Sequence, residues 1–254
     1  MNLVDFSTGI VFSTLLIFCR VGSAVMFLPG VGETFISPMI RLTFAVLLSI
    51  MLVPLYQSIL PPVPNSSLEM ALLIGGEITI GIVIGMTMKI ILSAIHVLGM
   101  TISYQSGLSS GMMFDPSQGT QGTLFGNLLS MIVIVMIISG DLHYILIKGI
   151  TNSYTLFTIG SYYQNYDDFT NVIIKTTNDA FNVGIQMSAP FIVGGLLLFI
   201  VSGVLSRLMP QLQIFFLMLP VQIILSLIIV MASISAVVLW FIEYYTDTIT
   251  NLFG

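Results

Sequence analysis

Three charged side chains lie inside long apolar runs of the sequence: Arg20, Glu77 and Lys89. A charge at the centre of a bilayer costs roughly 3 kcal/mol or more unless it reaches the interface or finds a partner. Such groups can pair with one another, contact a neighbouring subunit or line a path for ions. We favour intramembrane polar pairing for all three, because a proton-relay transporter needs several convergent groups and the sequence supplies few.

The histidines and the single cysteine offer no catalytic or metal site. Asp141 and His143 are two residues apart, and on a helix that spacing points them to different faces. His96 has apolar neighbours and is better explained as a packed side chain than as a ligand. Cys19 alone cannot form an intrachain disulfide or a cysteine-based metal site. With no H-E-x-x-H motif and no phosphate-binding G-x-x-x-x-G-K-[ST] motif, we expect neither an enzyme nor a bound cofactor.

Residues 107–122 combine turn-forming residues with adaptable apolar ones. Their four glycines and one proline exclude a continuous helix, whereas Met112, Met113 and Phe114 suit free solvent poorly. Irregular backbone at membrane depth is tolerated only where it is buried in protein or lines a cavity. Two interpretations stay open: an exposed loop, or a deformable plug whose thioether and aromatic groups seal a conduit.

Composition indicates the medium in which these residues lie. The 254 residues are 56% hydrophobic and only 7% charged, whereas soluble domains are about 25% charged. Too few charges remain to cover a water-soluble fold, so most of the surface must meet lipid or other protein. The net charge is −5 and the six cations are scattered singly, which argues against nucleic acid as a partner.

The chain is predicted to be all-α: a polytopic membrane protein of about six long helices in a single domain, 1–254. In lipid, every backbone polar group must be bonded within its own segment, so apolar runs of about 20 residues indicate helices. The alternating pattern of a membrane barrel is absent. The expected spans are 8–28, 39–60, 69–103, 124–150, 183–206 and 213–242. The expected connections include a polar stretch at 161–179.

One apolar run is too long for a simple crossing. Residues 68–104 would reach about 50 Å as one helix, against a hydrocarbon core of about 30 Å, so the helix must tilt, break or leave the bilayer. Within it, Gly81 and Gly85 form a G-x-x-x-G pair that allows another helix backbone to approach closely. We favour general helix packing over a specific partner face for this pair.

The cations give an orientation. Short cytoplasmic loops collect Lys and Arg, and Arg41 and Arg207 flank the first and fifth connections. This arrangement places both termini outside the cytoplasm. Lys148 and Lys175, near the fourth connection, argue mildly for the opposite orientation.

Several segments together resemble a known family. The 107–118 segment with Phe114-Asp115-Pro116, the Asp141-Leu142-His143 region and above all residues 207–216 resemble the FliR/SctT family of type III secretion proteins. Residues 18–21, followed by Pro29 and by residues 38–41, fit the same pattern. Order and spacing hold from about residue 12 to 225, which is nearly the whole chain.

The resemblance implies a non-enzymatic subunit of the export gate in the bacterial inner membrane, at the flagellar basal body. Such a subunit assembles with FliP and FliQ, next to FlhB and FlhA, and passes unfolded flagellar proteins. Residues 1–180 would be a FliP-like portion, and 181–254 a FliQ-like helical hairpin. The alternatives are the equivalent subunit of a virulence secretion system or, less favoured, a secondary transporter for ions or small molecules.

The resemblance also implies two sets of site residues. A cytoplasmic loop that contacts FlhB would include Arg207, Pro210 and Gln211. The chain departs from the family pattern at Gln222, where a basic residue is common, and at Leu142, where glycine is common. The channel plug would comprise Gly107, Gly111, Met112, Met113, Phe114, Asp115 and Pro116.

Overall fold

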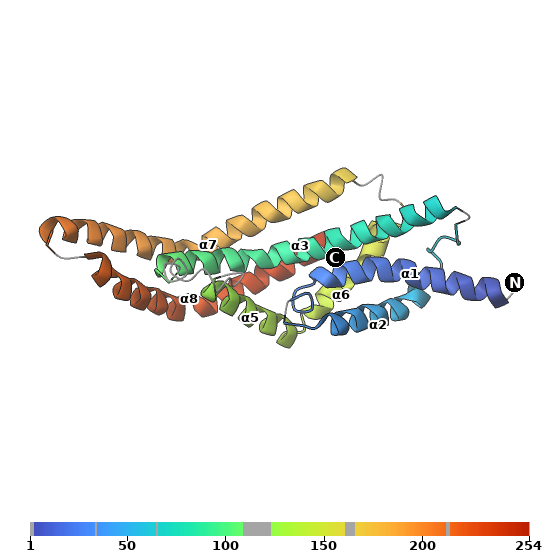
Figure 1. Ribbon diagram of the computed structural model, residues 1–254, viewed down its shortest axis with the longest axis horizontal. Helices are drawn as coiled ribbons and strands as arrows, with labels where there is room; N and C mark the ends of the chain where they lie inside the picture. Colours follow the sequence, from blue (N-terminus) through green and yellow to red (C-terminus); the bar gives the residue numbers. More distant parts are fainter. Residues whose placement is uncertain are drawn as a thin grey trace. The chain divides into compact units, whose positions relative to one another are not determined.

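The computed structural model describes residues 3–33, 35–64, 66–108, 123–160, 166–211 and 214–253, and these ranges contain seven α-helices and no strand (Figure 1). The all-α prediction is confirmed. The helices are α1 (Leu3–Phe27), α2 (Pro38–Tyr56), α3 (Ser67–Gln105), α5 (Leu124–Ser139), α6 (His143–Leu156), α7 (Tyr166–Leu208) and α8 (Ile214–Phe253).

Five of the described helices are long and apolar enough to cross a membrane, and α5 with α6 would make a sixth span if counted together. This agrees with the expectation of about six spans. Helix α3 contains 39 residues without a break, so the long apolar run does not end at any of its glycines. At a rise of about 1.5 Å per residue, α3 exceeds the hydrocarbon thickness.

The continuous helix predicted at 124–150 is wrong, because the chain bends by 78° between α5 and α6. Asp141 has a φ of +58°. Its N–H donates to the Ile138 carbonyl at 3.3 Å, and the Leu142 N–H donates to the Ile137 carbonyl at 3.0 Å. These two bonds form a Schellman motif, which ends a helix by placing one residue in the left-handed region. A hydropathy average does not detect this helix end, because the residues on both sides of it are apolar.

The polar connection predicted at 161–179 is also wrong from residue 166 onward, because α7 already begins at Tyr166. The residues are polar, but none between 166 and 183 is Gly or Pro. Phe169, Thr176 and Ala180 are buried, and their spacing of seven and four is that of one helical face. Similarly, α8 continues to Phe253 instead of ending near residue 242.

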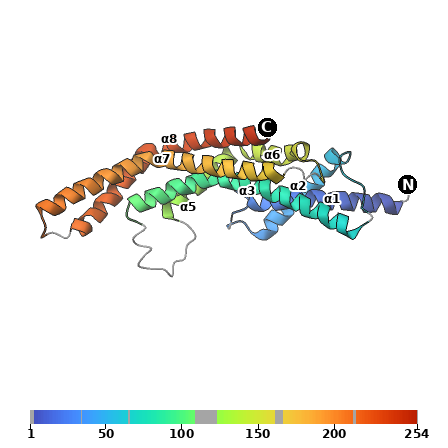
Figure 2. The ribbon, with the colours of Figure 1, turned by 90° about the horizontal axis from the view of Figure 1, so that it is seen from above.

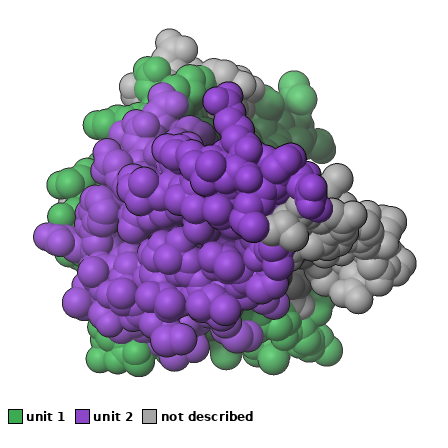
Figure 3. Space-filling view, turned by 90° about the vertical axis from the view of Figure 1, so that its left-hand side faces the viewer, with its two compact units in different colours: residues 1–91, 137–177, 246–254 green, residues 92–136, 178–245 purple. Residues whose placement is uncertain are grey.

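The chain forms two compact units, coloured separately in Figure 3. Unit 1 contains residues 1–91, 137–177 and 246–254, and unit 2 contains residues 92–136 and 178–245. Segments distant in sequence therefore meet in each unit.

In unit 1, α1 and α2 are antiparallel neighbours (Figure 1), and α3 packs closely against α1. A Cβ placed on Gly81 would collide with the Arg20 carbonyl and the Ser23 hydroxyl. A Cβ on Gly85 would lie 2.6 Å from the Ala24 carbonyl. The predicted close approach at the G-x-x-x-G pair is therefore confirmed, and the neighbour is a helix of the same chain.

In unit 2, small residues again allow close helix contacts. The backbones of α3 and α5 meet where Gly99 faces Gly126, with no room for a Cβ on the former. A Cβ on Gly184 of α7 would lie 2.8 Å from the Ala94 carbonyl of α3. The unit 2 portions of α7 and α8 form a long antiparallel hairpin (Figure 2).

Candidate functional site

Arg20 of α1 and Glu77 of α3 form a buried, bidentate ion pair in unit 1. Arg20 Nε donates to Glu77 Oε2 at 2.7 Å, and Arg20 Nη2 donates to Oε1 at 2.9 Å. The side chains are 0% and 1% exposed. Parallel N–H···O bonds between guanidinium and carboxylate are among the stronger protein hydrogen bonds, and here they neutralise two charges far from water.

The remaining nitrogen of Arg20 binds the end of α6. Nη1 donates to the Ser153 carbonyl at 3.1 Å and to the Phe157 carbonyl at 3.0 Å. The Ser153 carbonyl also accepts the Phe157 N–H at 2.9 Å, and cationic side chains are favoured near the last carbonyls of a helix. Arg20 therefore binds two backbone acceptors as well as one carboxylate.

One tyrosine covers the guanidinium, and a second tyrosine stacks on the first. The Arg20 Cζ atom lies 4.2 Å from the centre of the Tyr154 ring, close enough for a cation–π interaction. Tyr56 of α2 stacks on Tyr154, with the two ring centres 4.5 Å apart. Its hydroxyl donates to the Thr151 carbonyl at 2.9 Å. The cluster thus connects α1, α2, α3 and α6.

Helix spacing explains why the pair forms. Glu77, Gly81 and Gly85 follow one another at intervals of four on α3, and Arg20 and Ala24 have the same spacing on α1. Residues four apart share a helix face. The glycines bring the two backbones together, so the carboxylate one turn away faces the guanidinium.

Lys89, the third predicted member of the polar pairing, lies elsewhere. It is exposed on α3 and forms no ion pair with any residue of the described ranges. Because all the charge of Arg20 and Glu77 is used internally, these two residues form a structural clamp and leave no free acid or base. The pairing of Lys89 stays a prediction.

The start of the predicted plug is fixed within unit 2. Gly107 follows α3 with a φ of +72°, and its N–H donates to the Tyr104 carbonyl at 3.2 Å. A Cβ at this position would lie 3.0 Å from the Gln222 Oε1 atom and 3.1 Å from Leu219 Cδ2. The chain therefore leaves α3 against α8, at a position that favours glycine. The other six plug residues lie outside the described residues: Gly111, Met112, Met113, Phe114, Asp115 and Pro116.

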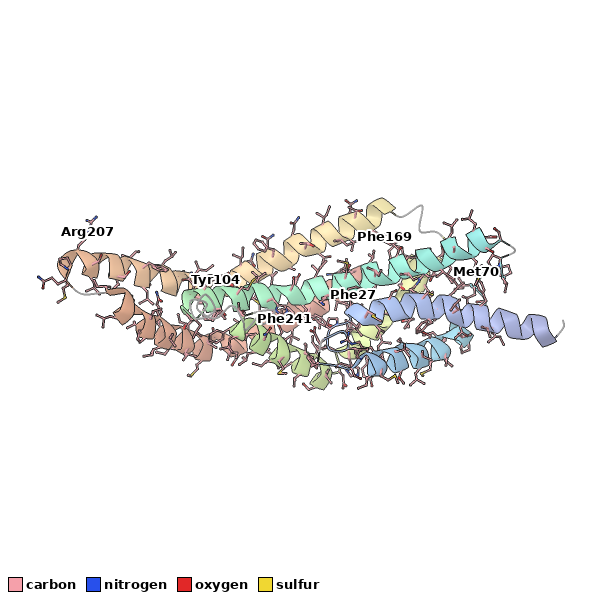
Figure 4. The ribbon with its side chains drawn as sticks, viewed as in Figure 1. Phe27, Met70, Tyr104, Phe169, Arg207 and Phe241 are labelled. Carbon is pink, nitrogen blue, oxygen red and sulfur yellow. The ribbon has the colours of Figure 1, made fainter. Side chains whose placement is uncertain are left out.

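The predicted partner loop lies at the tip of the α7–α8 hairpin. Arg207 is in the last turn of α7, at the tip seen in Figure 4. Pro210 and Gln211 follow in the turn, and all three residues are exposed. A single cation among exposed Leu208 and Met209 gives this tip an apolar surface with one positive charge.

Neither histidine belongs to the cluster. The His96 ring lies 3.3 Å from the Ser130 hydroxyl between α3 and α5. His143 begins α6, and Asp141 occupies the bend before it. Within the described ranges, no three His, Cys, Asp or Glu side chains converge as a metal site.

The sequence contains one match to a catalytic motif that sequence reasoning missed. Residues 107–111 read Gly-Leu-Ser-Ser-Gly, which has the G-x-S-x-G spacing of a hydrolase nucleophile. That motif requires a sharp turn between a strand and a helix. Here the first glycine follows a 39-residue helix, so the context for an exposed nucleophile is missing and the match carries no catalytic meaning.

Comparison with known proteins identifies the family. Residues 11–248 match the model of a family described as bacterial export proteins, family 1. The flagellar biosynthetic protein FliR of Caulobacter vibrioides is 32% identical over 237 residues, which cover 93% of this chain and 94% of that protein. The chain belongs to the FliR family.

More distant FliR proteins agree. The Bacillus subtilis protein is 27% identical over 88% of this chain and 86% of its own length. The Escherichia coli protein is 25% identical over 92% of this chain and 88% of its own length. The chain is therefore a non-enzymatic FliR component of the flagellar export gate, in the bacterial inner membrane. The expected resemblance and function are confirmed.

Proposed function

We propose that this FliR chain forms part of the wall of the export conduit and closes it with the segment that follows α3. The main supporting observation is that Gly107 has a positive φ and lies against α8, which fixes the place where that segment leaves α3. Met112, Met113 and Phe114 then supply adaptable apolar groups that seal the passage between substrates. Unfolded flagellar proteins displace the seal as they pass.

The wall role is supported by the rigidity of unit 1. Arg20 and Glu77 neutralise one another, and Arg20 also binds two carbonyls at the end of α6 and a tyrosine ring, so neither charge is available to carry ions. Breaking such a buried pair is strongly unfavourable. We infer that unit 1 is a static framework, and that movement during export is confined to other segments.

The proposed partners are FliP, FliQ, FlhB and FlhA. In this proposal residues 1–180 take the FliP-like place in the gate, and the hairpin at 181–254 takes the place of a FliQ subunit. Its long helices expose many apolar side chains, including Leu196 and Ile228, which suits contact with similar hairpins. The exposed tip with Arg207, Pro210 and Gln211 is the proposed cytoplasmic contact for FlhB.

The assembly is tested by co-expressing the tagged chain with its FliP- and FliQ-like neighbours, followed by purification in mild detergent and native mass spectrometry. We expect one discrete complex that contains all three proteins. A stable particle of this chain alone, despite good expression of the other two, would contradict the gate assignment.

The plug is tested in the assembled gate by substituting Phe114→Ala or Met113→Ala. Loss of the seal opens a path for small ions, so we expect ion leakage across the membrane to rise in the absence of substrate. Phe35→Ala is the matched control, because Phe35 is an exposed aromatic residue between α1 and α2, outside both the plug and the α7–α8 hairpin. Leakage equal to that of the control would refute the plug.

A further inference from the structure

Unit 1 contains an apolar groove beside the ion-pair cluster. Its volume is about 410 Å³, within the range of small-ligand sites. Side chains of α1, α2 and α3 line it, among them Phe18, Leu42 and Ile78. Phe27, at the C-terminal end of α1 in Figure 4, also borders it.

One cation lies at this otherwise apolar groove. Arg41, in the first turn of α2, uses Nη2 to donate to the Glu33 carbonyl at 2.6 Å and to the Ile36 carbonyl at 2.9 Å. Its Nε atom is buried without a hydrogen-bond partner, and no carboxylate among the described residues forms an ion pair with it. The two carbonyls therefore hold the guanidinium in place through Nη2, whereas among the described residues Nη1 has no hydrogen-bond partner and no carboxylate balances the charge.

The Nη1 amino group of Arg41 can therefore bind an anion. Its N–H groups can donate to a phosphate oxygen, and such a charge-assisted hydrogen bond is stronger than a neutral one. The surrounding α2 surface is apolar, since Met39, Ile40 and Leu42 are all more than half exposed at 75%, 60% and 52%. A ligand that fits both features has an anionic phosphate and a long hydrocarbon tail.

We propose that this groove binds one anionic phospholipid, with its phosphate on Arg41 and an acyl chain between α1, α2 and α3. The predicted orientation places Arg41 at the cytoplasmic side, where the leaflet carries negative surface charge. The lipid would complete the charge balance at the start of α2 and fill a space that no side chain of unit 1 occupies.

The test uses the full chain in mild detergent, titrated with phosphatidylglycerol or phosphatidylcholine of identical acyl chains and observed by native mass spectrometry. We expect phosphatidylglycerol to bind about tenfold more tightly, because only its net charge opposes that of Arg41. Arg41→Gln should reduce its binding to the phosphatidylcholine level. Lys175→Gln, at an exposed cation on α7, is the matched control and should change nothing.

A second variant tests binding of the acyl chain in the groove independently of the charge of Arg41. Gly22 lines the groove and has room for a Cβ, since the nearest atoms belong to Phe18 at 3.5 Å or more. Gly22→Leu should therefore obstruct the acyl chain and weaken both lipids. If Arg41→Gln fails to fold, Arg41→Lys is the alternative variant: it keeps the positive charge, so phosphatidylglycerol should still bind more tightly than phosphatidylcholine, and equal binding of the two lipids would contradict the role of the charge.

Three results would overturn the proposal. Equal binding of the two lipids would remove the role of charge. Unchanged phosphatidylglycerol binding in both Arg41→Gln and Gly22→Leu would place the lipid elsewhere. A groove that takes no phospholipid, but in which Cys19 becomes protected from maleimide only when gate partners co-purify, would identify a partner subunit as the occupant.

Discussion

Substitution of Glu77 by Gln removes the countercharge of a fully buried arginine. Both oxygens of Glu77 accept bonds from Arg20, at 2.7 and 2.9 Å, and the pair is 0% and 1% exposed. Glutamine keeps the shape but presents an amide nitrogen where one acceptor stood. Removing one partner of a buried ion pair destabilises by about 3–5 kcal/mol.

The effect of Glu77→Gln should lie near the lower limit of that range. Arg20 keeps two carbonyl acceptors through Nη1 and keeps its contact with the Tyr154 ring. We therefore expect a loss of about 3 kcal/mol in the free energy of unfolding, a change of roughly a hundredfold in the unfolding equilibrium. Unit 1 should open more readily, because the pair joins α1 to α3.

The assay uses the only cysteine of the chain. Cys19 is half-buried and adjacent to Arg20, so its reaction with a fluorogenic maleimide reports opening of this part of unit 1. The purified protein is unfolded with increasing mole fractions of dodecyl sulfate in mild detergent. Glu69→Gln is the matched control, because Glu69 is an exposed carboxylate on the same helix, and surface changes stay within about 0.5 kcal/mol.

A double variant checks the reasoning. Arg20→Gln combined with Glu77→Gln leaves no unpaired buried charge, so its destabilisation should fall short of the sum of the single variants by at least about 1 kcal/mol. A Glu77→Gln protein as stable as the Glu69→Gln control, or strictly additive effects in the double variant, would refute the view that this ion pair holds unit 1 together.

Three further substitutions test close contacts and turns. Gly81→Ala places a Cβ against the α1 backbone and should destabilise by about 1–3 kcal/mol in the same unfolding assay, whereas Gly75→Ala, in open space, should be neutral or mildly stabilising. Gly107→Ala should lower the free energy of unfolding by about 1–2 kcal/mol because of the positive φ at this position. Gly203→Ala is the control, and equal stability of the two variants would contradict the left-handed turn. Asp141→Gly should raise stability by about 1 kcal/mol, since glycine adopts a φ of +58° without strain, and an unchanged or lower stability would count against the Schellman motif.

Much of the architecture followed from composition alone. A chain that is 56% hydrophobic and 7% charged cannot satisfy its backbone in lipid except by forming helices. The apolar runs therefore located α1, α2 and α3 to within a few residues, apart from the N-terminal start of α1. The run at 124–150 was harder, because a helix stop made by one left-handed aspartate leaves no gap in hydropathy.

The start of α7 was missed for the opposite reason. Its first turns are polar, and polarity was taken as a sign of a loop. The buried face formed by Phe169, Thr176 and Ala180 shows a helical period that a hydropathy average does not detect. A periodicity count over residues 166–183 would have extended the helix.

The sequence by itself determined that Arg20, Glu77 and Lys89 are costly in lipid, because that cost depends only on residue type and the surrounding apolar run. Which of them meet was decided by tertiary structure. Arg20 and Glu77 are 57 positions apart, and their distance depends on how closely α1 and α3 approach at Gly81 and Gly85. A pairing between two helices depends on their separation and rotation, which packing sets and which no local pattern encodes.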